Sequence, residues 1–268
     1  MSAAPAARWI PPLCRRGAWQ MALDEWLLDQ AVLANGAGGA VLRFYHWQQP
    51  TLSIGYHQRR LPERWREVVK REGLDIVRRP SGGRAVLHAG ELTYALVWPQ
   101  APQRRTEAYR QSCRWLQCAF AELGQPLLFG SQAAAGERSS CFASSTAADL
   151  VHADGAKRIG SAQLWRNGCL LQHGSILLQP PERLWRSLFE HAPPPLAPLP
   201  LAGAELLGHL RRCAEWDLPP LGGTPLQEQA LQAHEWGAIA PYLDRYAVPA
   251  EGWPPNQTPP KPQTPGPS

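Results

Sequence analysis

Residues Asp149 to Ile176 contain two hairpin signals flanked by apolar runs, and this pattern narrows the possible folds of the chain considerably. One signal is the turn His152-Ala153-Asp154-Gly155, and the other is Arg166-Asn167-Gly168. Asn-Gly between apolar segments is a strong short-range indicator of a β-hairpin. The stretch therefore predicts a β-rich meander.

Helical and extended patterns both precede this meander. Residues 18–33 place Trp19, Leu23, Trp26 and Leu27 on one face at a spacing of 3.6 residues, which predicts an amphipathic helix. Further helices are predicted over 61–72 and 106–123. Runs rich in β-branched and aromatic residues predict strands at VLRFYHW (41–47), TLSIGYHQ (51–58), DIVRR (75–79) and, interrupted by loops, 84–98. The chain is expected to form an α+β domain.

The character of the sequence changes after Leu178, which suggests three regions. We expect one catalytic-type domain over residues 1–190. Residues 191–247 are expected to form a proline-rich linker (193–200) and a small helical extension, with helices over 202–217 and 225–246. Residues 248–268 are rich in proline and are expected to be disordered.

Composition and charge exclude several classes of protein. There is no run of 18 apolar residues and no apolar segment between the N-terminal charges, so we expect no membrane association, no secretory signal and a cytoplasmic location. The net charge of +5 is scattered, and no nucleic-acid motif is present, so we expect acidic protein partners and no nucleic acid. The six cysteines show no zinc-finger spacing; we expect reduced thiols and no metal site.

The segment RRPSGGRAVLH, from Arg78 to His88, is the first candidate for chemistry. Paired glycines between two strands let backbone N–H groups approach a ligand where a Cβ would collide. Flanking arginines suit a carboxylate, a phosphate or an oxyanion. From the residues alone, a glycine-rich hairpin turn with solvated arginines is an equally good interpretation. No GxxxxGK[ST] sequence occurs, so this is not a Walker A loop.

Three other polar positions stand out beside this glycine turn. Lys157 follows a hairpin turn and enters a strand among small residues, where it could hold an anion or a developing oxyanion. His173 interrupts an apolar strand, which carries a cost unless it is hydrogen-bonded. Cys141 lies in a polar loop, where a nearby cation would lower the pKa of its thiol. Taken singly, each residue also has a simpler interpretation. Lys157 could be an exposed lysine, His173 a structural histidine and Cys141 an unreactive cysteine.

Taken in order, these segments resemble the lipoate–protein ligase A and octanoyltransferase family, within the biotin/lipoate ligase superfamily. The resemblance runs from about Met21 to Ile176 and rests on an ordered set of short motifs. They are MALDEWLLD, PTLSIGYHQ, RRPSGGRAVLH, ELTYAL, GAKRIGSAQ and LLQHGSI.

The resemblance implies a central mixed β-sheet with flanking helices and an acyl chain held in a tunnel beside the glycine turn. It assigns the family's catalytic lysine to Lys157 and, by the loop position of the cysteine-dependent octanoyltransferases, a nucleophile to Cys141. No metal is assigned. The acyl-binding residues expected from the motifs are Arg79, Ser81, Gly82, Gly83, Arg84, His88, Gly160, Ser161 and His173.

Two chemistries occur in this family, and the motifs favour one of them. Octanoyltransferases take octanoate from octanoyl-acyl carrier protein without a cofactor, whereas lipoate ligases use ATP and Mg²⁺ to form an acyl-adenylate. Cys141, Arg84 in place of a third glycine, and the short extension favour the transferase. Two departures weaken the match: Ala89 follows His88 where the family commonly has an acidic residue, and residues 131–148 lack the family's usual residues around the cysteine.

The expected acceptor is a lysine of the lipoyl domain of a 2-oxoacid dehydrogenase E2 subunit or of the glycine-cleavage H protein. The ATP-dependent ligase is the alternative. A non-catalytic acyl-binding protein would not need Lys157 or the glycine turn, and a biotin ligase would carry a GRGRxG-type loop that is absent here.

Overall fold

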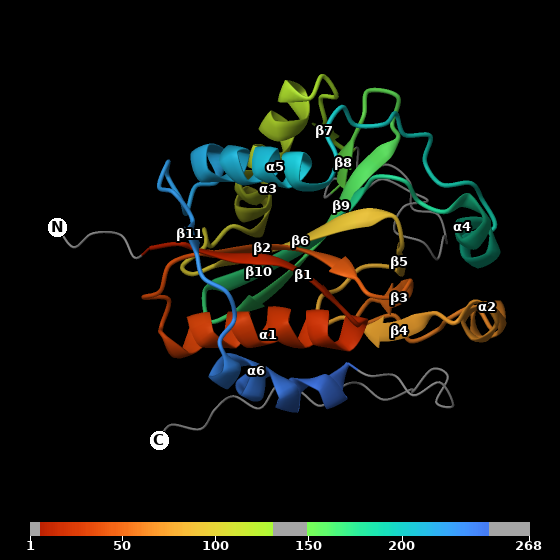
Figure 1. Cartoon of the computed structure of the whole chain (residues 1–268), viewed down its shortest axis with the longest axis horizontal. Coiled ribbons are helices and arrows are strands. Elements are labelled where there is room, and N and C mark those ends of the chain that lie inside the picture. The colour runs from red at the N-terminus through yellow and green to blue at the C-terminus, as the bar shows by residue number, and fades with distance from the viewer. Residues whose placement is uncertain (1–5, 131–148, 247–268) are drawn as a thin grey trace.

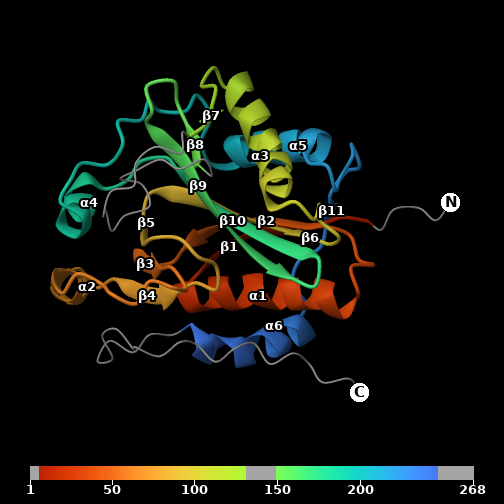
Figure 2. The same cartoon turned by 180° about the vertical axis from the view of Figure 1, so that it is seen from behind.

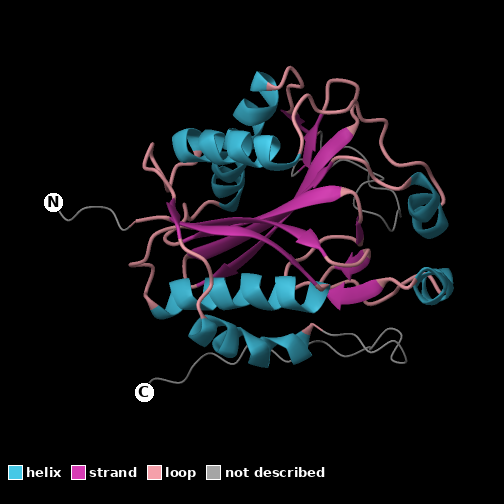
Figure 3. Ribbon diagram, viewed as in Figure 1, coloured by secondary structure: helices cyan, strands magenta, loops and turns pink. Residues whose placement is uncertain are grey.

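The computed structural model describes residues 6–130 and 149–246, which form two β-sheets with helices packed around them (Figures 1 and 3). The large sheet has the strand order β11-β1-β2-β6-β10-β9-β8-β7. Its strands are β1 (Arg8–Arg15), β2 (Val41–Trp47), β6 (Glu91–Trp98), β7 (Leu128–Phe129), β8 (Asp149–Val151), β9 (Lys157–Arg166), β10 (Cys169–Leu177) and β11 (Gln227–Glu228). The small sheet has the order β4-β3-β5, formed by β3 (Thr51–Ile54), β4 (Asp75–Arg78) and β5 (Val86–His88).

The large sheet is mixed, as the sequence led us to expect. Strand β1 runs parallel to β2 and to β11, whereas the ladder from β2 through β6, β10, β9 and β8 to β7 is antiparallel. The predicted hairpin between β9 and β10 turns at Asn167 and Gly168, which have φ of 45° and 79°. Two successive positive φ angles are what a two-residue type I′ hairpin turn requires.

Helices cover both faces of the large sheet, and Figures 1 and 2 show the two layers on opposite sides. One layer is α1 (Gly17–Leu33), with α6 (Ala233–Ile239) and the 3₁₀-helix η1 (Ala240–Arg245) outside it. The other is α3 (Arg105–Glu122) with α5 (Gly203–Asp217). Two shorter helices, α2 (Arg64–Glu72) and α4 (Glu182–Phe189), pack with the small sheet.

Two apolar clusters lie on the two faces of the large sheet. Phe44, Leu96, Trp115 and Leu210 belong to the cluster beneath α3 and α5, which joins the C-terminal extension to the main core. The second cluster lies between the sheet, α1 and the C-terminal helices. Because α6 and η1 cover its outer side, α1 is buried more widely than the single apolar face predicted from its sequence.

The structure differs from the sequence analysis at both ends of the chain. Strand β1 was not predicted; it contains Pro11 and Pro12, and its register with β2 shifts between Ile10 and Leu13. Such an irregularity accommodates residues that cannot donate to the ladder. The helix predicted over 225–246 begins only at Ala233, because residues 227–228 instead form β11 beside β1. No helix in the described part of the chain is both long and apolar enough to cross a membrane.

Candidate functional site

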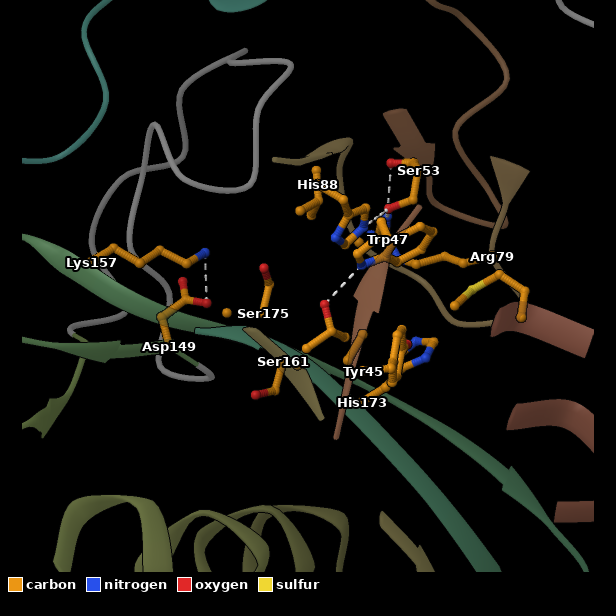
Figure 4. Close-up of a pocket in the computed structure, with 17 residues that line it drawn as sticks. Tyr45, Trp47, Ser53, Arg79, His88, Asp149, Lys157, Ser161, His173 and Ser175 are labelled. Atoms are coloured by element: carbon orange, nitrogen blue, oxygen red, sulfur yellow. Dashed lines mark hydrogen bonds and ion pairs between the residues drawn. The ribbon is translucent and has the colours of Figure 1, made fainter. Parts of the chain in front are cut away.

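A cavity of about 510 Å³, open to solvent at its mouth, lies between the two sheets and extends over β9 and β10 (Figure 4). Its wall is formed by Met21, Tyr45, Trp47, Ser53, Arg79, Gly83, Val86, His88, Thr93, Asp149, Lys157, Gly160, Ser161, Ala162, His173, Gly174 and Ser175.

A buried ion pair marks one end of the cavity. Lys157 Nζ lies 2.8 Å from Asp149 Oδ1, and each side chain is only 5% exposed. Lys157 is the first residue of β9, and Asp149 is the first residue of β8, the neighbouring strand. In Figure 4 the pair lies apart from the residues around Trp47 and His88. A cation held in so dry a position can stabilise negative charge far better than one in water.

The glycine turn approaches the loop after β3 so closely that side chains are excluded. A Cβ on Gly55 would lie 1.8 Å from the carbonyl oxygen of Gly83, so no other residue fits there without moving the backbone. Two arginines that we expected to face a ligand are used to hold this backbone. Arg79 donates to the carbonyl oxygens of Gly82 at 2.8 Å and Arg84 at 2.6 Å, and Arg78 donates to that of Gly55 at 3.0 Å.

His173 is held between a carboxylate and a hydroxyl. Its Nδ1 lies 3.0 Å from Asp24 Oδ2, and its Nε2 lies 2.5 Å from Ser81 Oγ. Asp24 also accepts hydrogen bonds from Arg43 at 2.6 Å and from the Tyr45 hydroxyl at 3.2 Å. Burial raises the pKa of Asp24, but the charges and hydrogen bonds of Arg43 and His173 outweigh burial and lower it overall. Asp24 is therefore a carboxylate that joins α1 to the glycine turn.

An Asp24→Asn variant is expected to be less stable by about 3–5 kcal/mol, because it leaves the Arg43 guanidinium, 1% exposed, without its counter-charge. Urea denaturation followed by tryptophan fluorescence measures the change. The matched control is Glu182→Gln, which breaks an exposed pair with Arg186 and should alter stability by less than about 0.5 kcal/mol.

The same carboxylate predicts the pH dependence of stability. The pKa of Asp24 is lowered from its ordinary value of 3.8, so its contribution is complete above about pH 5 and is lost as the pH falls from there through the folded-state pKa. The wild-type protein should therefore lose more stability between pH 5 and pH 3 than Asp24→Asn does. Equal losses in both proteins would contradict this assignment.

His88 is the centre of a second group of polar contacts beside the glycine turn. Its Nε2 lies 2.8 Å from Ser53 Oγ, its Nδ1 lies 2.8 Å from Glu91 Oε1, and its ring stacks on Trp47 with 3.8 Å between centroids. Burial lowers the pKa of His88, more than the Glu91 carboxylate raises it. The imidazole is therefore neutral near pH 7, and the Trp47 ring gives this part of the cavity a flat apolar wall.

The floor of the cavity is formed by β10 and its neighbours. A Cβ on Gly174 would lie 2.5 Å from both Ser161 Oγ and a Tyr94 ring carbon, so the glycine allows the 2.8 Å hydrogen bond between those two hydroxyls. The hydroxyl of Ser175 is buried at the cavity wall and has no hydrogen-bond partner among the described residues. It is therefore available to a polar group of a ligand.

The structure brings most of the residues predicted from sequence to one cavity. Those in its wall are Arg79, Gly83, His88, Lys157, Gly160, Ser161 and His173. Three others are not in its wall: Ser81 supports His173, Gly82 lines a neighbouring hollow, and the Arg84 carbonyl accepts a bond from Arg79. Cys141 lies outside the described residues.

Several cavity residues were not predicted. Asp149, Trp47, Ser53 and Ser175 are in the wall, and Asp24 lies behind it. Asp24 lies within MALDEWLLD, one of the motifs that carry the family resemblance, and Trp47 ends the strand VLRFYHW.

Comparison with known proteins identifies relatives of this chain. The family described as "Lipoyl protein ligase A/B catalytic domain" matches residues 16–192. A protein of Geobacillus kaustophilus named octanoyltransferase LipM is 42% identical over 186 residues, which are 65% of this chain and 66% of the relative. A Staphylococcus aureus protein of the same name is 41% identical over 171 residues, which are 59% of this chain and 61% of the relative. The chain thus spans slightly less than two thirds of the length of these relatives.

Solved structures show the same fold. A protein of T. acidophilum described as a lipoate protein ligase, with bound lipoic acid, has a TM-score of 0.73 at 19% identity, covering 89% of this chain and 95% of that chain. A lipoate-protein ligase A bound with ATP also has a TM-score of 0.73 at 19% identity, over 90% of this chain and 95% of that chain. The α+β architecture predicted from the sequence is therefore confirmed.

Proposed function

Since the chain belongs to the lipoyl protein ligase A/B catalytic domain family, we propose that it transfers an octanoyl group from octanoyl-acyl carrier protein to a lysine of a carrier domain during protein lipoylation. The observation that carries this proposal is the cavity itself, which places the buried Lys157–Asp149 pair at one end and a lining of aromatic and small residues along its length. The names of the bacterial relatives support the same activity.

The acyl chain lies along the cavity, with its carbonyl group toward Lys157. Trp47, Tyr45 and Met21 supply apolar surface for the methylene groups. At about 0.8 kcal/mol per buried methylene, an eight-carbon chain gains roughly 5 kcal/mol on entering the cavity. Gly174 and Gly160, which have no side chains, form part of the cavity wall along which the chain lies.

Cys141 is the proposed nucleophile of the first step. Its thiolate attacks the thioester carbonyl, the acyl–sulfur bond of the donor breaks, and the acyl group remains on Cys141 while the carrier leaves as a thiolate. The described residues that flank segment 131–148 lie next to each other, since the Gly130 N–H donates to the Asp149 carbonyl at 2.8 Å, and the Asp149 side chain is paired with Lys157. Cys141 precedes Asp149 by eight residues. Because an extended chain spans at most about 3.6 Å per residue, this length is sufficient for the Cys141 thiol to reach the Lys157 amino group.

Lys157 stabilises the negative charge of the reaction. Its ammonium favours the thiolate over the thiol and attracts the oxyanion of each tetrahedral intermediate. The backbone N–H group of Gly83, in the cavity wall, is the proposed further donor to that oxyanion.

In the second step the amine of the acceptor lysine attacks the acyl–Cys141 carbonyl. An amide bond forms, the bond to sulfur breaks, and the proton lost by the amine is taken by the departing Cys141 thiolate. Conversion of a thioester to an amide is downhill, so this route needs no ATP and no metal. A reduced thiol is required throughout, which fits a cytoplasmic enzyme.

We propose acyl carrier protein as the donor and, as acceptor, the lipoyl domain of a 2-oxoacid dehydrogenase E2 subunit or the glycine-cleavage H protein. Such carriers are typically acidic, and the net charge of +5 favours their approach. Neither nucleic acid nor membrane is required.

An assay without ATP tests the proposed activity. The purified protein is mixed with octanoyl-acyl carrier protein and an apo H protein, and every protein is weighed by intact mass spectrometry. An octanoyl group on the enzyme and then on the H protein is the expected result. Transfer only after addition of ATP, Mg²⁺ and free octanoate or lipoate would instead identify the alternative, a lipoate–protein ligase that forms an acyl-adenylate.

A Gly55→Ala variant tests whether the glycine turn positions the substrate. The new Cβ meets the Gly83 carbonyl at 1.8 Å, so the turn must shift, and a displacement of about 1 Å at a reacting site costs on the order of a hundredfold in rate. We expect kcat/KM to fall by about ten- to a hundredfold. Gly38→Ala is the control, since a Cβ at Gly38 meets nothing within 4 Å; equal rates in the two variants would contradict the positioning role.

A further inference from the structure

Helices α3 and α5 lie on the face of the large sheet opposite α1 (Figure 1). They bring together three side chains of types that can bind a metal, none of which is in the wall of the acyl cavity. Glu122 is the last residue of α3, and His209 and Cys213 are one helical turn apart on α5. One ligand atom from each residue lies within 4.8 Å of the other two. Glu122 Oε2 is 3.8 Å from Cys213 Sγ and 3.8 Å from His209 Nδ1.

These separations are close to those of a coordinated metal. Zinc binds sulfur, nitrogen and oxygen at about 2.0–2.3 Å in a tetrahedron, which places neighbouring ligand atoms roughly 3.5 Å apart. Cys213 Sγ lies 3.8 Å from His209 Nε2, the other ring nitrogen, so the Cys213 side chain must turn toward Nδ1 for both residues to bind one ion. The His209 and Cys213 side chains are buried, whereas Glu122 is 64% exposed and can adjust its position.

The histidine is already fixed in the form that a metal requires. His209 Nε2 lies 2.9 Å from the carbonyl oxygen of Ala119, and a carbonyl oxygen can only accept, so Nε2 carries the hydrogen. Nδ1 therefore presents its lone pair toward Glu122. Metal-binding histidines usually donate their second ring N–H to a carbonyl or a carboxylate in this way.

The charges also suit a divalent ion. A thiolate, a carboxylate and a neutral imidazole together carry two negative charges, which a divalent ion neutralises in this mostly buried position. A solvent molecule can supply the fourth ligand on the exposed side, where Glu122 lies.

We propose that Glu122, His209 and Cys213 form a binding site for a divalent transition-metal ion, with zinc the best fit to this donor set. The ion replaces the thiol proton of Cys213, which leaves to solvent, and ties α5 to α3. Because α5 begins at Gly203, beyond the family match at residues 16–192, the site would fasten the C-terminal extension to the catalytic domain. The proposal does not depend on the acyl-transfer activity.

Metal titrations of the full-length protein test the site. Cobalt(II), added to protein first treated with a chelator, should give the near-ultraviolet absorption of a thiolate–cobalt bond, and one equivalent of zinc should remove it. Zinc at about 100 times its Kd should raise the Tm by roughly 5–10 °C. Cys213→Ala and His209→Gln should each bind zinc at least about tenfold more weakly and, at the same zinc concentration, lose about half of this increment or more.

Two controls separate the proposed site from other thiols and histidines. Cys118→Ser, on α3, and His234→Gln, on the exposed side of α6, should keep the absorption and the full Tm increment. For each variant, the Tm with zinc is compared with the Tm of the same variant without zinc. A loss of core packing in Cys213→Ala lowers both values and therefore does not affect the difference. Thiolate–cobalt absorption that persists in Cys213→Ala, or an unchanged zinc increment in both variants, would show that the proposal is wrong.

Discussion

A Lys157→Ala variant is expected to transfer octanoate about 10²- to 10³-fold more slowly than the wild type, which is the loss produced elsewhere by removing one donor to an oxyanion. The reason is the position of the ammonium group, which is 5% exposed and therefore acts on the reacting atoms with little screening by water. Initial rates of octanoyl transfer to an apo H protein, measured at several donor concentrations, give kcat/KM. A loss smaller than about tenfold, or 1.4 kcal/mol of barrier, would mean that Lys157 is not central to the reaction.

The buried partner of Lys157 must be controlled in the same experiment. Lys157→Ala leaves the Asp149 carboxylate buried without its counter-charge, and such a loss can destabilise a protein by about 3–5 kcal/mol. In the double variant Lys157→Met/Asp149→Asn both charges are absent, so its free energy of unfolding should lie closer to that of the wild type. If the double variant is folded but remains slow, the defect lies in the chemistry, whereas recovery of activity in it would assign the defect to unfolding.

Much of the fold follows from short patterns in the sequence, because those patterns reflect local geometry. Strand β2 has the β-branched and aromatic residues typical of a strand, and the β9–β10 hairpin has its Asn167-Gly168 turn; both were predicted, as was helix α3. Strand β1 was missed because two prolines interrupt it. Its place in the sheet depends on β2 and β11, which lie far from it along the chain.

The site could be predicted only in part for the same reason. Lys157 and the glycine turn lie in compact motifs, so they were identified without knowing the fold. The partners that give these groups their environment come from distant segments: Asp24 meets His173 across 149 positions of the chain. Asp149 meets Lys157 only through the irregular register between β8 and β9. The sequence indicates the residues that perform chemistry more readily than those that set their charge and orientation.

The largest effect is expected for Cys141. In Cys141→Ser the transfer of octanoate without ATP should fall by about 10⁴-fold or more, since removing the nucleophile of a covalent mechanism leaves only the contribution of binding and oxyanion stabilisation. A serine hydroxyl keeps the size of the side chain but is not ionised by a neighbouring cation near pH 7, so it cannot replace the thiolate. The octanoyl adduct on the enzyme should be absent from the intact mass spectrum.

A control variant at another cysteine and the Lys157→Ala variant are needed to interpret the loss of activity in Cys141→Ser. Cys14→Ser, which changes an exposed cysteine at the end of β1, should keep both the adduct and the rate. If Lys157 stabilises the Cys141 thiolate, Lys157→Ala should also form the adduct more slowly, and the deficit should shrink as the pH is raised toward the ordinary thiol pKa of about 8.5. Full activity of Cys141→Ser without ATP would refute the thioester intermediate. The acyl group would then pass directly from the donor to the acceptor lysine, and Lys157 alone would stabilise the negative charge in the cavity.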